Sequence, residues 1–428
     1  MSPLSIVNLI LIIIAAIILV PVLVFSFECL LSVLLVRRKR PVSNNAQPHV
    51  AVLIPAHNEQ FVIEETLRTL LPTLQPDDRV VVIADNCTDE TAMVAQTFGV
   101  EVVERQSDDC RGKAYALECG VQYLTADPPD VVIVLDADCK VDANLVSRIS
   151  EESHARVRPV QGRNLSTAET SSHAVHSVSE LGFCFKNLVR PLGAARIGLP
   201  CHLMGTGMAI PWKILRGTSF TSDHLAEDMQ FGIELAIKGF PTTFCPDVGI
   251  TSQLPKDEQA FLNQRTRWEQ GHLRTSLTQT PRLLFAGLFK LRPSLLFLAF
   301  DLTVPPLSLL ILIGLATSSV TILAGFLGAS WVPAMMLIGG GLLMLSATIA
   351  GWFTFCRESV PLKSLLAIPG YIIRKVPIYV SYFTGKKQRE WIRTQRDSER
   401  ASPDSPTILN EETNSETEPA VSLHSVGK

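Results

Sequence analysis

The chain has 428 residues, of which 47% are hydrophobic and 18% charged, and its mean hydropathy is +0.25. This balance excludes an ordinary soluble enzyme and an intrinsically disordered chain. A formal net charge of −3 lacks the basic surplus that phosphate backbones attract, so we expect no nucleic-acid partner. Nine cysteines, an odd number without a CxxC pair, indicate neither a disulfide framework nor a zinc site.

The N-terminal segment is long and apolar enough to be a membrane anchor. Residues 3–27 carry no charged side chain, and a helix of that length crosses about 30 Å of hydrocarbon. A cleavable signal peptide is the competing interpretation, but it requires basic residues before the apolar run, and here Arg37–Arg40 follow it. We therefore expect residues 1–40 to form an anchor with a basic flank. The positive-inside rule then places the N-terminus outside and the next domain in the cytosol.

The central segment, residues 47–290, has the pattern of a soluble α/β domain. Three short apolar runs are typical of buried strands in a parallel sheet, and they span 49–54, 80–84 and 131–135. Stretches with helical spacing lie between and after them, at 60–71, 91–98 and 114–124. The pattern predicts a doubly wound fold, in which ligands bind at the carboxyl ends of the strands.

Polar clusters follow each of the three predicted strands. The first strand ends in PAHNE (55–59), the second in DNCTD (85–89) and the third in DAD (136–138). Alone, DNCTD is more simply an Asx-turn with a helix cap, and a DxD often only caps a helix. Their convergence on one edge of the sheet favours a site where carboxylates reach a divalent cation, Mg²⁺ or Mn²⁺, that holds a diphosphate.

A second apolar region lies after the central domain. No charged residue occurs from Leu302 to Cys356, so we expect two transmembrane helices within 295–356, with a turn at Gly328–Pro333. These two helices and the N-terminal anchor make three spans, which return the chain to the cytosol.

The C-terminal part has two regions of different character. Residues 362–396 combine an apolar stretch, interrupted by prolines and by Arg374 and Lys375, with a basic end, which is typical of an amphipathic segment in the membrane interface. The tail 397–428 is rich in Ser, Thr, Pro and Glu, so we expect it to be acidic and disordered.

Six motifs, in this order, resemble those of a membrane-bound family 2 glycosyltransferase, similar to the cellulose, chitin and hyaluronan synthase branch. They are IPAHNE (54–59), DNCTDET (85–91), GKA (112–114), LDADCKVD (135–142), AED (226–228) and QRTRW (264–268). The resemblance implies a GT-A fold, a nucleotide-diphospho-sugar donor that is usually a UDP-sugar, a divalent metal, and inverting transfer to a sugar hydroxyl or a related acceptor.

The resemblance also assigns roles by position. The residues implied to bind the nucleotide part of the donor are Pro55, His57, Glu59, Asp85, Lys113 and Asp136. Asp138 is implied to contact the metal, and Glu227 and Asp228 to be catalytic, with Asp228 as the general base. Two simpler interpretations remain open: Lys113 as a solvated helix residue, and Asp228 as a helix cap.

QRTRW places Gln264, Arg267 and Trp268 on one face of a helix, expected at 260–280 in the interface. Gln264 and Arg267 would contact the donor, where a guanidinium pairs with diphosphate oxygens as the leaving group gains charge. Trp268 would stack on the acceptor sugar, unless it is only an interfacial anchor.

A glycine-containing loop at 204–208 resembles the loop below the sugar acceptor. Its implied acceptor-binding residues are Gly205, Thr206 and Gly207, although a plain tight turn has the same sequence. One position departs from the processive synthases, which commonly have Thr where this chain has Ala226. Three spans are also fewer than the large translocating synthases use.

We expect an integral membrane enzyme, in the cell (inner) membrane, that glycosylates a polysaccharide or glycolipid on the cytosolic side in contact with membrane lipids. An oligomer or an accessory export protein stays open as a partner. The alternatives are transfer of one sugar to a lipid hydroxyl or to a lipid or polyprenyl phosphate, of which QRTRW disfavours only the phosphate version, and a nucleotide-binding scaffold without catalysis. A scaffold has no need for acidic residues at 85, 136, 138 and 228 together.

Overall fold

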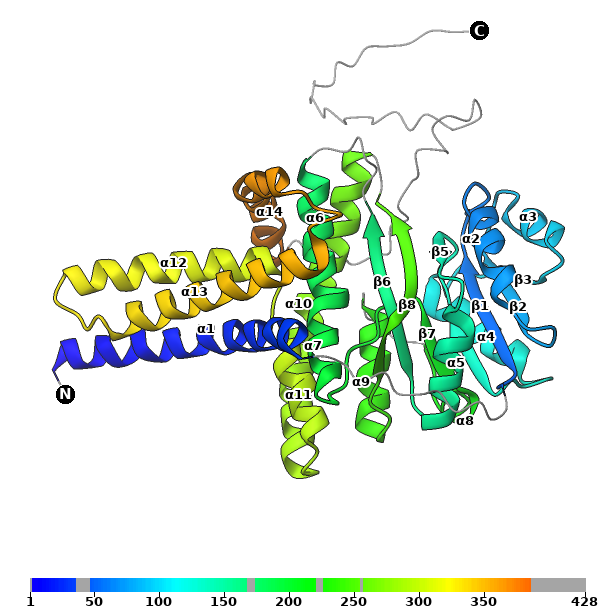
Figure 1. Ribbon diagram of the computed structural model, residues 1–428, viewed down its shortest axis with the longest axis horizontal. Coiled ribbons are helices and arrows are strands. Elements are labelled where there is room, and N and C mark those ends of the chain that lie inside the picture. Colours follow the sequence, from blue (N-terminus) through cyan, green and yellow to red (C-terminus); the bar gives the residue numbers. More distant parts are fainter. Residues whose placement is uncertain (1, 36–46, 168–173, 221–225, 255–256, 386–428) are drawn as a thin grey trace, which may run out of the picture.

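The computed structural model describes residues 2–35, 47–167, 174–220, 226–254 and 257–385. The predictions for Arg37–Arg40, for the basic segment 386–396 and for the tail 397–428 lie outside these residues. Figure 1 shows three parts in sequence across the molecule: a β-sheet with its own helices, a layer of helices against it, and a bundle of long helices that projects from the far side of that layer.

The first part is built on an eight-stranded mixed sheet with the order β3-β2-β1-β4-β7-β6-β8-β5. The strands are β1 (Val50–Ala56), β2 (Arg79–Asp85), β3 (Glu101–Arg105), β4 (Val131–Val134), β5 (Cys139–Val141), β6 (Val160–Thr167), β7 (Met208–Pro211) and β8 (Thr243–Gln253). The three predicted strands are β1, β2 and β4, and β1 pairs in parallel with both others. Beyond these three strands the sheet is mixed, because β7 runs antiparallel to β4 and to β6.

Helices cover both faces of the sheet, which explains why the predicted strands are continuously apolar. One face packs on α2 (Ile63–Leu70), α3 (Thr91–Thr97) and α5 (Leu145–Arg156), and the other on α4 (Lys113–Leu124), α8 (Trp212–Leu215) and α9 (Glu227–Lys238). On α4, a Cβ added at Gly120 would lie 3.0 Å from a methyl carbon of Leu53, so the helix packs closely on β1. The predicted α/β class is confirmed.

The helix layer joins the sheet to the long helices. It consists of α6 (Ala174–Cys184), a π-helical turn η2 (Phe185–Val189), α7 (Arg190–Arg196), α10 (Glu258–Phe289), α11 (Pro293–Leu302) and α14 (Ile368–Phe383). The helix predicted at 260–280 is longer at both ends. A second correction concerns α11: it falls in the region predicted to hold two transmembrane helices, yet Leu295 and Leu298 pack it against α9 and α10.

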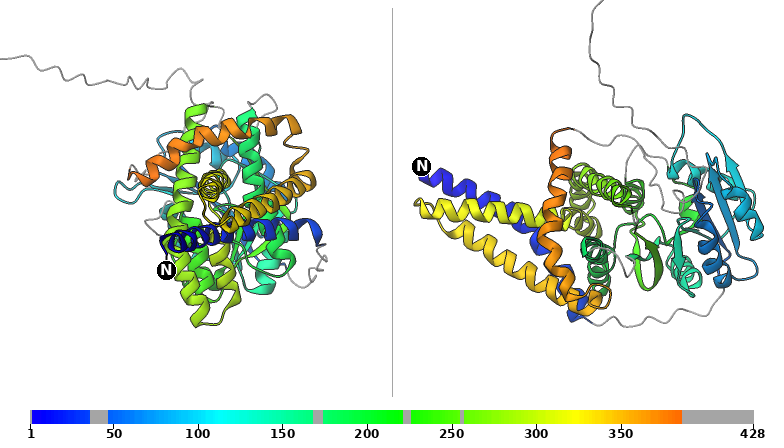
Figure 2. Two further views of the ribbon diagram at one scale, coloured as in Figure 1. Left: turned by 90° about the vertical axis from the view of Figure 1, so that its left-hand side faces the viewer. Right: turned by 90° about the horizontal axis from the view of Figure 1, so that it is seen from above.

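In the described part of the chain, three helices are long and apolar enough to cross a membrane: α1 (Pro3–Leu34), α12 (Leu307–Phe326) and α13, whose Val332–Gly351 helix continues as a π-helical turn to Cys356. Many of their large apolar side chains are exposed, such as Ile17 and Leu323. Figure 1 places the N-terminus and the α12–α13 turn at the end of the bundle far from the sheet, and Figure 2 shows the three helices side by side. The sheet therefore lies beyond one end of the bundle.

Buried charges fix α1 to the helix layer. Arg190 Nε of α7 donates to Glu28 Oε2 of α1 at 2.5 Å, and its Nη2 pairs with Asp301 of α11. A Cβ added at Gly193 would lie 1.9 Å from the Glu28 carbonyl oxygen, so the backbones of α1 and α7 touch where only glycine fits. The anchor is thus a packed element of the domain.

Candidate active site

A cavity of about 1850 Å³ opens at the carboxyl ends of β1, β2 and β4. All of the predicted site residues except Gly207 line it. Gly207 does not line it: its amide donates to the Val134 carbonyl and its carbonyl accepts from Gly162, both at 2.9 Å, which joins it to the sheet, and its role as an acceptor contact stays a prediction. The cavity residues are Pro55, His57, Glu59, Asp85, Lys113, Asp136, Asp138, Gly205, Thr206, Glu227, Asp228, Gln264, Arg267 and Trp268.

The ends of β1 and β2 are held together by side chains of their loops. His57 Nδ1 donates to the Asp85 carbonyl at 2.7 Å, and the Thr88 amide donates to Asn58 Oδ1 at 2.7 Å. In the same cluster, Asp89 accepts from the Thr91 amide at 3.0 Å. The Asx-turn and cap expected for DNCTD are therefore the role of Asp89, whereas Asp85 faces the cavity.

The Asp85 carboxylate has a partner that the sequence did not indicate. Arg105, at the end of β3, donates to Asp85 Oδ1 at 2.5 Å and to the Cys110 carbonyl at 2.7 Å. Its guanidinium also lies 5.8 Å from the ring centre of Tyr115, which lines the cavity. Arg105 thus fixes the carboxylate at this end of the cavity.

Lys113 is an internal ion-pair partner, and the interpretation as a solvated helix residue is wrong. It is the first residue of α4, after Gly112 with φ of +118°. Its Nζ pairs with Asp136 and donates to the Gly205 carbonyl at 2.8 Å. Burial lowers its pKa, but the charges of Asp136, Glu227 and Asp228 outweigh burial, and the net pKa is raised. The side chain is therefore an ammonium ion at neutral pH.

The DxD carboxylates lie close enough to influence one another. The Asp136 amide donates to Thr206 Oγ1 at 3.0 Å, which connects the end of β4 to the glycine loop. Burial and the charge of Asp138 raise the pKa of Asp136, against the pull of Lys113. Hard carboxylate oxygens fit Mg²⁺ or Mn²⁺. Within the described residues no three His, Cys, Asp or Glu side chains converge on a metal position.

Glu227 and Asp228 are the first two residues of α9, and both line the cavity. Ala226 makes no side-chain cap, and two acidic residues in the first turn favour the positive end of the helix dipole. Burial raises the pKa of Glu227 to about 7, with Lys113 and Arg267 opposing and Asp228 adding to the rise. Lys113 and both acidic residues thus belong to one electrostatic cluster.

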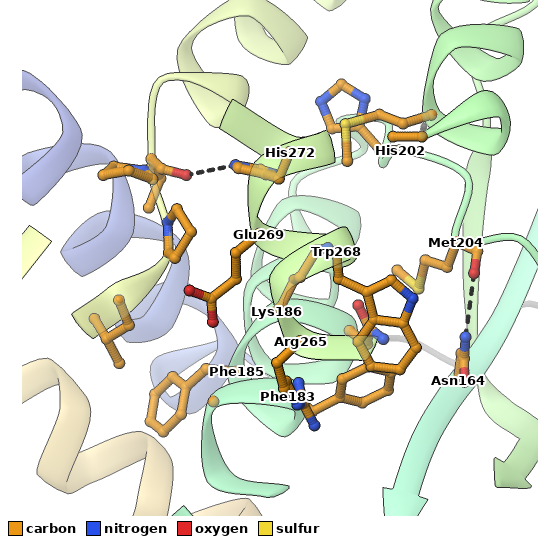
Figure 3. Close-up of a pocket in the computed structure, with 18 of the residues that line it drawn as sticks. Asn164, Phe183, Phe185, Lys186, His202, Met204, Arg265, Trp268, Glu269 and His272 are labelled. Atoms are coloured by element: carbon orange, nitrogen blue, oxygen red, sulfur yellow. Dashed lines mark hydrogen bonds between the residues drawn. The ribbon is translucent and has the colours of Figure 1, made fainter. Parts of the chain in front are cut away.

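The predicted face of α10 does line the cavity. Arg267 lies near Glu227, Asp136 and Asp228, whose charges oppose the lowering of its pKa by burial. The Trp268 ring packs on Phe183 at a centroid distance of 5.5 Å, and Figure 3 shows both rings beside Arg265. Trp268 is therefore turned into the cavity, whereas a membrane anchor would face outward.

Sequence reasoning passed over two cations in this cavity. Arg265, within QRTRW, lies over the rings of Phe183, Phe261 and Trp268 at 5.0 to 5.5 Å, and its Nε and Nη2 are buried without a hydrogen bond. Lys186 lies in the π-helical turn and also lines the cavity. QRTRW contains a second arginine two positions before Arg267, and this spacing was a signal for Arg265. Nothing in the sequence around Lys186 indicates a site.

Comparison with known proteins agrees with this geometry. Residues 48–271 match the family "Glycosyltransferase like family 2". The chain is 28% identical over 238 residues to the probable glycosyltransferase YdaM of Bacillus subtilis, covering 53% of this chain and 55% of that protein. It is 23% identical over 233 residues to a poly-beta-1,6-N-acetyl-D-glucosamine synthase of Staphylococcus epidermidis, covering 52% and 54%. The chain thus spans about half the length of the curated relatives it matches.

A solved structure shares the fold. The mannosyltransferase PcManGT from Pyrobaculum calidifontis, in complex with GDP-Man and Mn²⁺, superposes with a TM-score of 0.54 at 17% identity, covering 87% of this chain and all of that one. This agreement extends beyond the residues of the family match. It confirms the predicted GT-A fold with flanking apolar helices. The family match covers more than half of the sequence, and the chain belongs to glycosyltransferase family 2.

Proposed function

We propose that the protein is a metal-dependent, inverting glycosyltransferase, which moves a sugar from a nucleotide-diphospho-sugar to a glycan or glycolipid acceptor at the cytosolic membrane face. One observation carries the proposal: Lys113, Asp136, Glu227, Asp228 and Arg267 form a single cluster of charges on one wall of the cavity. A nucleotide-binding scaffold has no use for acidic groups beyond those that hold the nucleotide.

The chemistry follows from the positions of the charges. An acceptor hydroxyl attacks the anomeric carbon of the donor sugar and gives its proton to Asp228. A new carbon–oxygen bond forms, the bond to the phosphate oxygen breaks, and its electron pair leaves with the nucleoside diphosphate. Attack from the face opposite the leaving group inverts the configuration. Lys113 and Arg267 stabilise the negative charge that develops on the diphosphate.

The metal belongs to the same site. Asp138 would hold a divalent cation, with Asp136 beside it, and a bound cation would neutralise diphosphate charge. Pro55, His57, Glu59 and Asp85 line the part of the cavity that would receive the nucleotide, and Gln264 the part near the diphosphate. Gly205, Thr206 and Trp268 would face the acceptor.

The donor is proposed as a UDP-sugar, with GDP-mannose as the second choice. The name of the Staphylococcus epidermidis synthase favours N-acetylglucosamine as the donor sugar. The name of a glucomannan 4-beta-mannosyltransferase of Oryza sativa, 23% identical over 248 residues, favours mannose.

The three apolar helices are proposed to span the cell (inner) membrane, with the N-terminus outside. Three spans are few for a polymer channel, so a secreted polymer would need a second copy or an accessory export protein.

A donor screen tests the proposal. The purified full chain is incubated with UDP-glucose, UDP-N-acetylglucosamine or GDP-mannose, and with Mn²⁺, Mg²⁺ or EDTA, and released nucleoside diphosphate is measured. We expect release from one donor class, lost with EDTA and in Asp138→Asn. Tight nucleotide binding without release from any donor, with or without added glycan and lipid extracts, would support the scaffold instead.

A further inference from the structure

The cavity does not end at the catalytic carboxylates. It continues past Lys186 and reaches all three apolar helices, where Leu19 of α1, Gly314 of α12 and Gly341 of α13 line it. A Cβ added at Gly314 or Gly341 would meet no atom within 4 Å. The active site is therefore continuous with open space along the membrane helices.

The part of the cavity that lies along α1, α12 and α13 has an apolar wall. Among the described lining residues of the three helices, the polar side chains are Glu28, Ser308, Ser318 and Thr348. Glu28 is already neutralised by Arg190, and Ser308 bonds Tyr379 at 2.5 Å. A glycan passing through such a space would lose hydrogen bonds to water without replacement, whereas a hydrocarbon chain would lose none. The wall suits a lipid chain better than a sugar chain.

Lys186 stands where the polar and apolar parts of the cavity meet. Its neighbour Phe185 stacks on Phe25 of α1 at 5.7 Å, so η2 packs directly on the membrane helices. On the other side, Lys186 is close enough to Asp228 and Glu269 to be influenced by their charges. The side chain is exposed to the cavity, and no described residue forms an ion pair or hydrogen bond with it.

A second incompletely paired cation lies beside Lys186. Arg265 is held by aromatic faces, with two guanidinium nitrogens buried without a hydrogen bond, and its positive charge acts on Lys186. Burial lowers the pKa of Lys186, as expected for a cation whose carboxylate neighbours do not compensate it fully. The third guanidinium nitrogen, Nη1, is not among these enclosed atoms, and Arg265 lines the cavity, so an anionic group between Lys186 and Arg265 Nη1 would supply the missing partner.

We infer that the acceptor is a lipid whose headgroup contains phosphate: its chain lies along α1, α12 and α13, its phosphate lies between Lys186 and Arg265, and its hydroxyl-bearing end reaches Asp228. This inference rests on the proposed function and names the acceptor class for it. The phosphate, held by Lys186 and Arg265, sets the depth at which the reacting hydroxyl presents itself to the donor sugar.

Binding of a simple amphiphile tests the assignment independently of the donor. The full chain is released from detergent in a native mass spectrometer after incubation with dodecyl phosphate, with dodecyltrimethylammonium for the same chain and opposite charge, or with inorganic phosphate alone. We expect one dodecyl phosphate bound per chain, and at least tenfold weaker binding of the other two. Equal binding of both amphiphiles would overturn the role of the cations, and equal binding of inorganic phosphate would overturn the role of the apolar wall.

Matched variants locate the site. Gly341→Phe fills the cavity beside α13, whereas Gly339→Phe, two residues away, places the same ring in open space outside the cavity lining. Lys186→Gln removes the cation, and Lys213→Gln removes an exposed lysine of α8 that does not line the cavity. Gly341→Phe and Lys186→Gln should each weaken dodecyl phosphate binding at least tenfold, and the two control variants should not. Equal behaviour within either pair would contradict the inference.

The donor screen separates the two proposals. Nucleoside diphosphate release in the wild-type chain, together with dodecyl phosphate binding that none of the variants alters, would reject the lipid acceptor and leave the glycosyltransferase proposal intact. No release from any donor would reject the glycosyltransferase proposal itself, whatever the amphiphile does.

Discussion

Gly205 lies directly against the carboxylate of Asp228. A Cβ added at Gly205 would be 3.0 Å from Asp228 Oδ2, and the glycine has φ of +87°, a conformation that other residues adopt with strain. The Gly205 carbonyl also accepts from Lys113 Nζ at 2.8 Å. One glycine therefore sets the positions of the proposed base and of the lysine that pairs with Asp136.

Gly205→Ala should lower turnover by roughly tenfold or more, because even a small displacement of a proton-accepting group is costly in rate. Steady-state rates and nucleotide affinity of the purified variant check this. Gly198→Ala is the matched control: Gly198 has φ of +79°, but a Cβ there would meet nothing within 4 Å, and it does not line the cavity. An equal loss in both variants would assign the effect to backbone strain alone.

Asp138→Asn and Asp228→Asn should fail in different ways. Asp138→Asn should weaken metal-dependent donor binding, since it removes one of the proposed hard oxygen ligands of the metal. Asp228→Asn should keep donor binding and lower turnover by a factor on the order of 10² or more. Donor titrations with and without Mn²⁺, combined with single-turnover rates, measure both. The assignment of the base is wrong if the two variants lose donor binding equally.

The elevated pKa of Glu227 predicts a pH dependence of stability. Its pKa is about 7 in the folded protein and 4.5 when unperturbed, so between these values the folded state keeps a proton that the unfolded state has released. The free energy of unfolding contributed by Glu227 is therefore fully present below pH 4.5 and is lost as the pH rises to about 7. Thermal unfolding of Glu227→Gln in metal-free buffer at pH 5 and pH 8 should show a smaller decrease in Tm than the wild-type chain. Glu64→Gln, on the surface of α2, should keep the full decrease.

Trp268→Ala should impair use of the acceptor before it impairs use of the donor. Loss of a stacked ring costs about 1–2 kcal/mol, which corresponds to a five- to thirtyfold decrease in acceptor kcat/KM. Arg267→Ala should also slow donor hydrolysis without acceptor, because the guanidinium is proposed to stabilise the leaving group. Trp331→Ala is the control. Trp331 makes a T-shaped contact with Phe326 between α12 and α13, and it does not line the cavity. Full transfer by Trp268→Ala, with only a lower Tm, would remove Trp268 from the site.

The sequence reveals only those strands that are apolar throughout. The predicted strands match β1, β2 and β4, but β6 escaped prediction because it contains buried polar residues. Gln161 is fully buried, and its amide nitrogen donates to the Thr206 carbonyl at 2.8 Å. Its partner lies 45 residues away in the chain. The local pattern of apolar and polar residues does not predict that a polar residue is buried when its hydrogen-bond partner is distant in the sequence.

The site residues likewise fall into those that the sequence predicts and those that it does not. Asp136 and Asp138 were predictable because the motif that contains both follows the apolar run 131–135, and a strand end is a fixed place in an α/β fold. Arg105 and Lys186 were not, because their positions result from how β3 and η2 pack in three dimensions, and for Arg265 the sequence offered only the spacing of basic residues in QRTRW. The need for a glycine at a single position such as Gly193 likewise cannot be predicted until the position of the neighbouring backbone is known.

The ion pair between Glu28 and Arg190 has a consequence for the order of biosynthesis. α1 is made first, and the arginine that neutralises its glutamate follows 162 residues later. At the usual 5–20 residues per second, translation needs roughly 8 to 30 s to supply it. During that interval α1 carries an uncompensated carboxyl group near its C-terminal end. Under the proposed membrane insertion of α1, folding of the helix layer also neutralises this helix, and a nascent chain stalled before α7 should be an early substrate for membrane quality control.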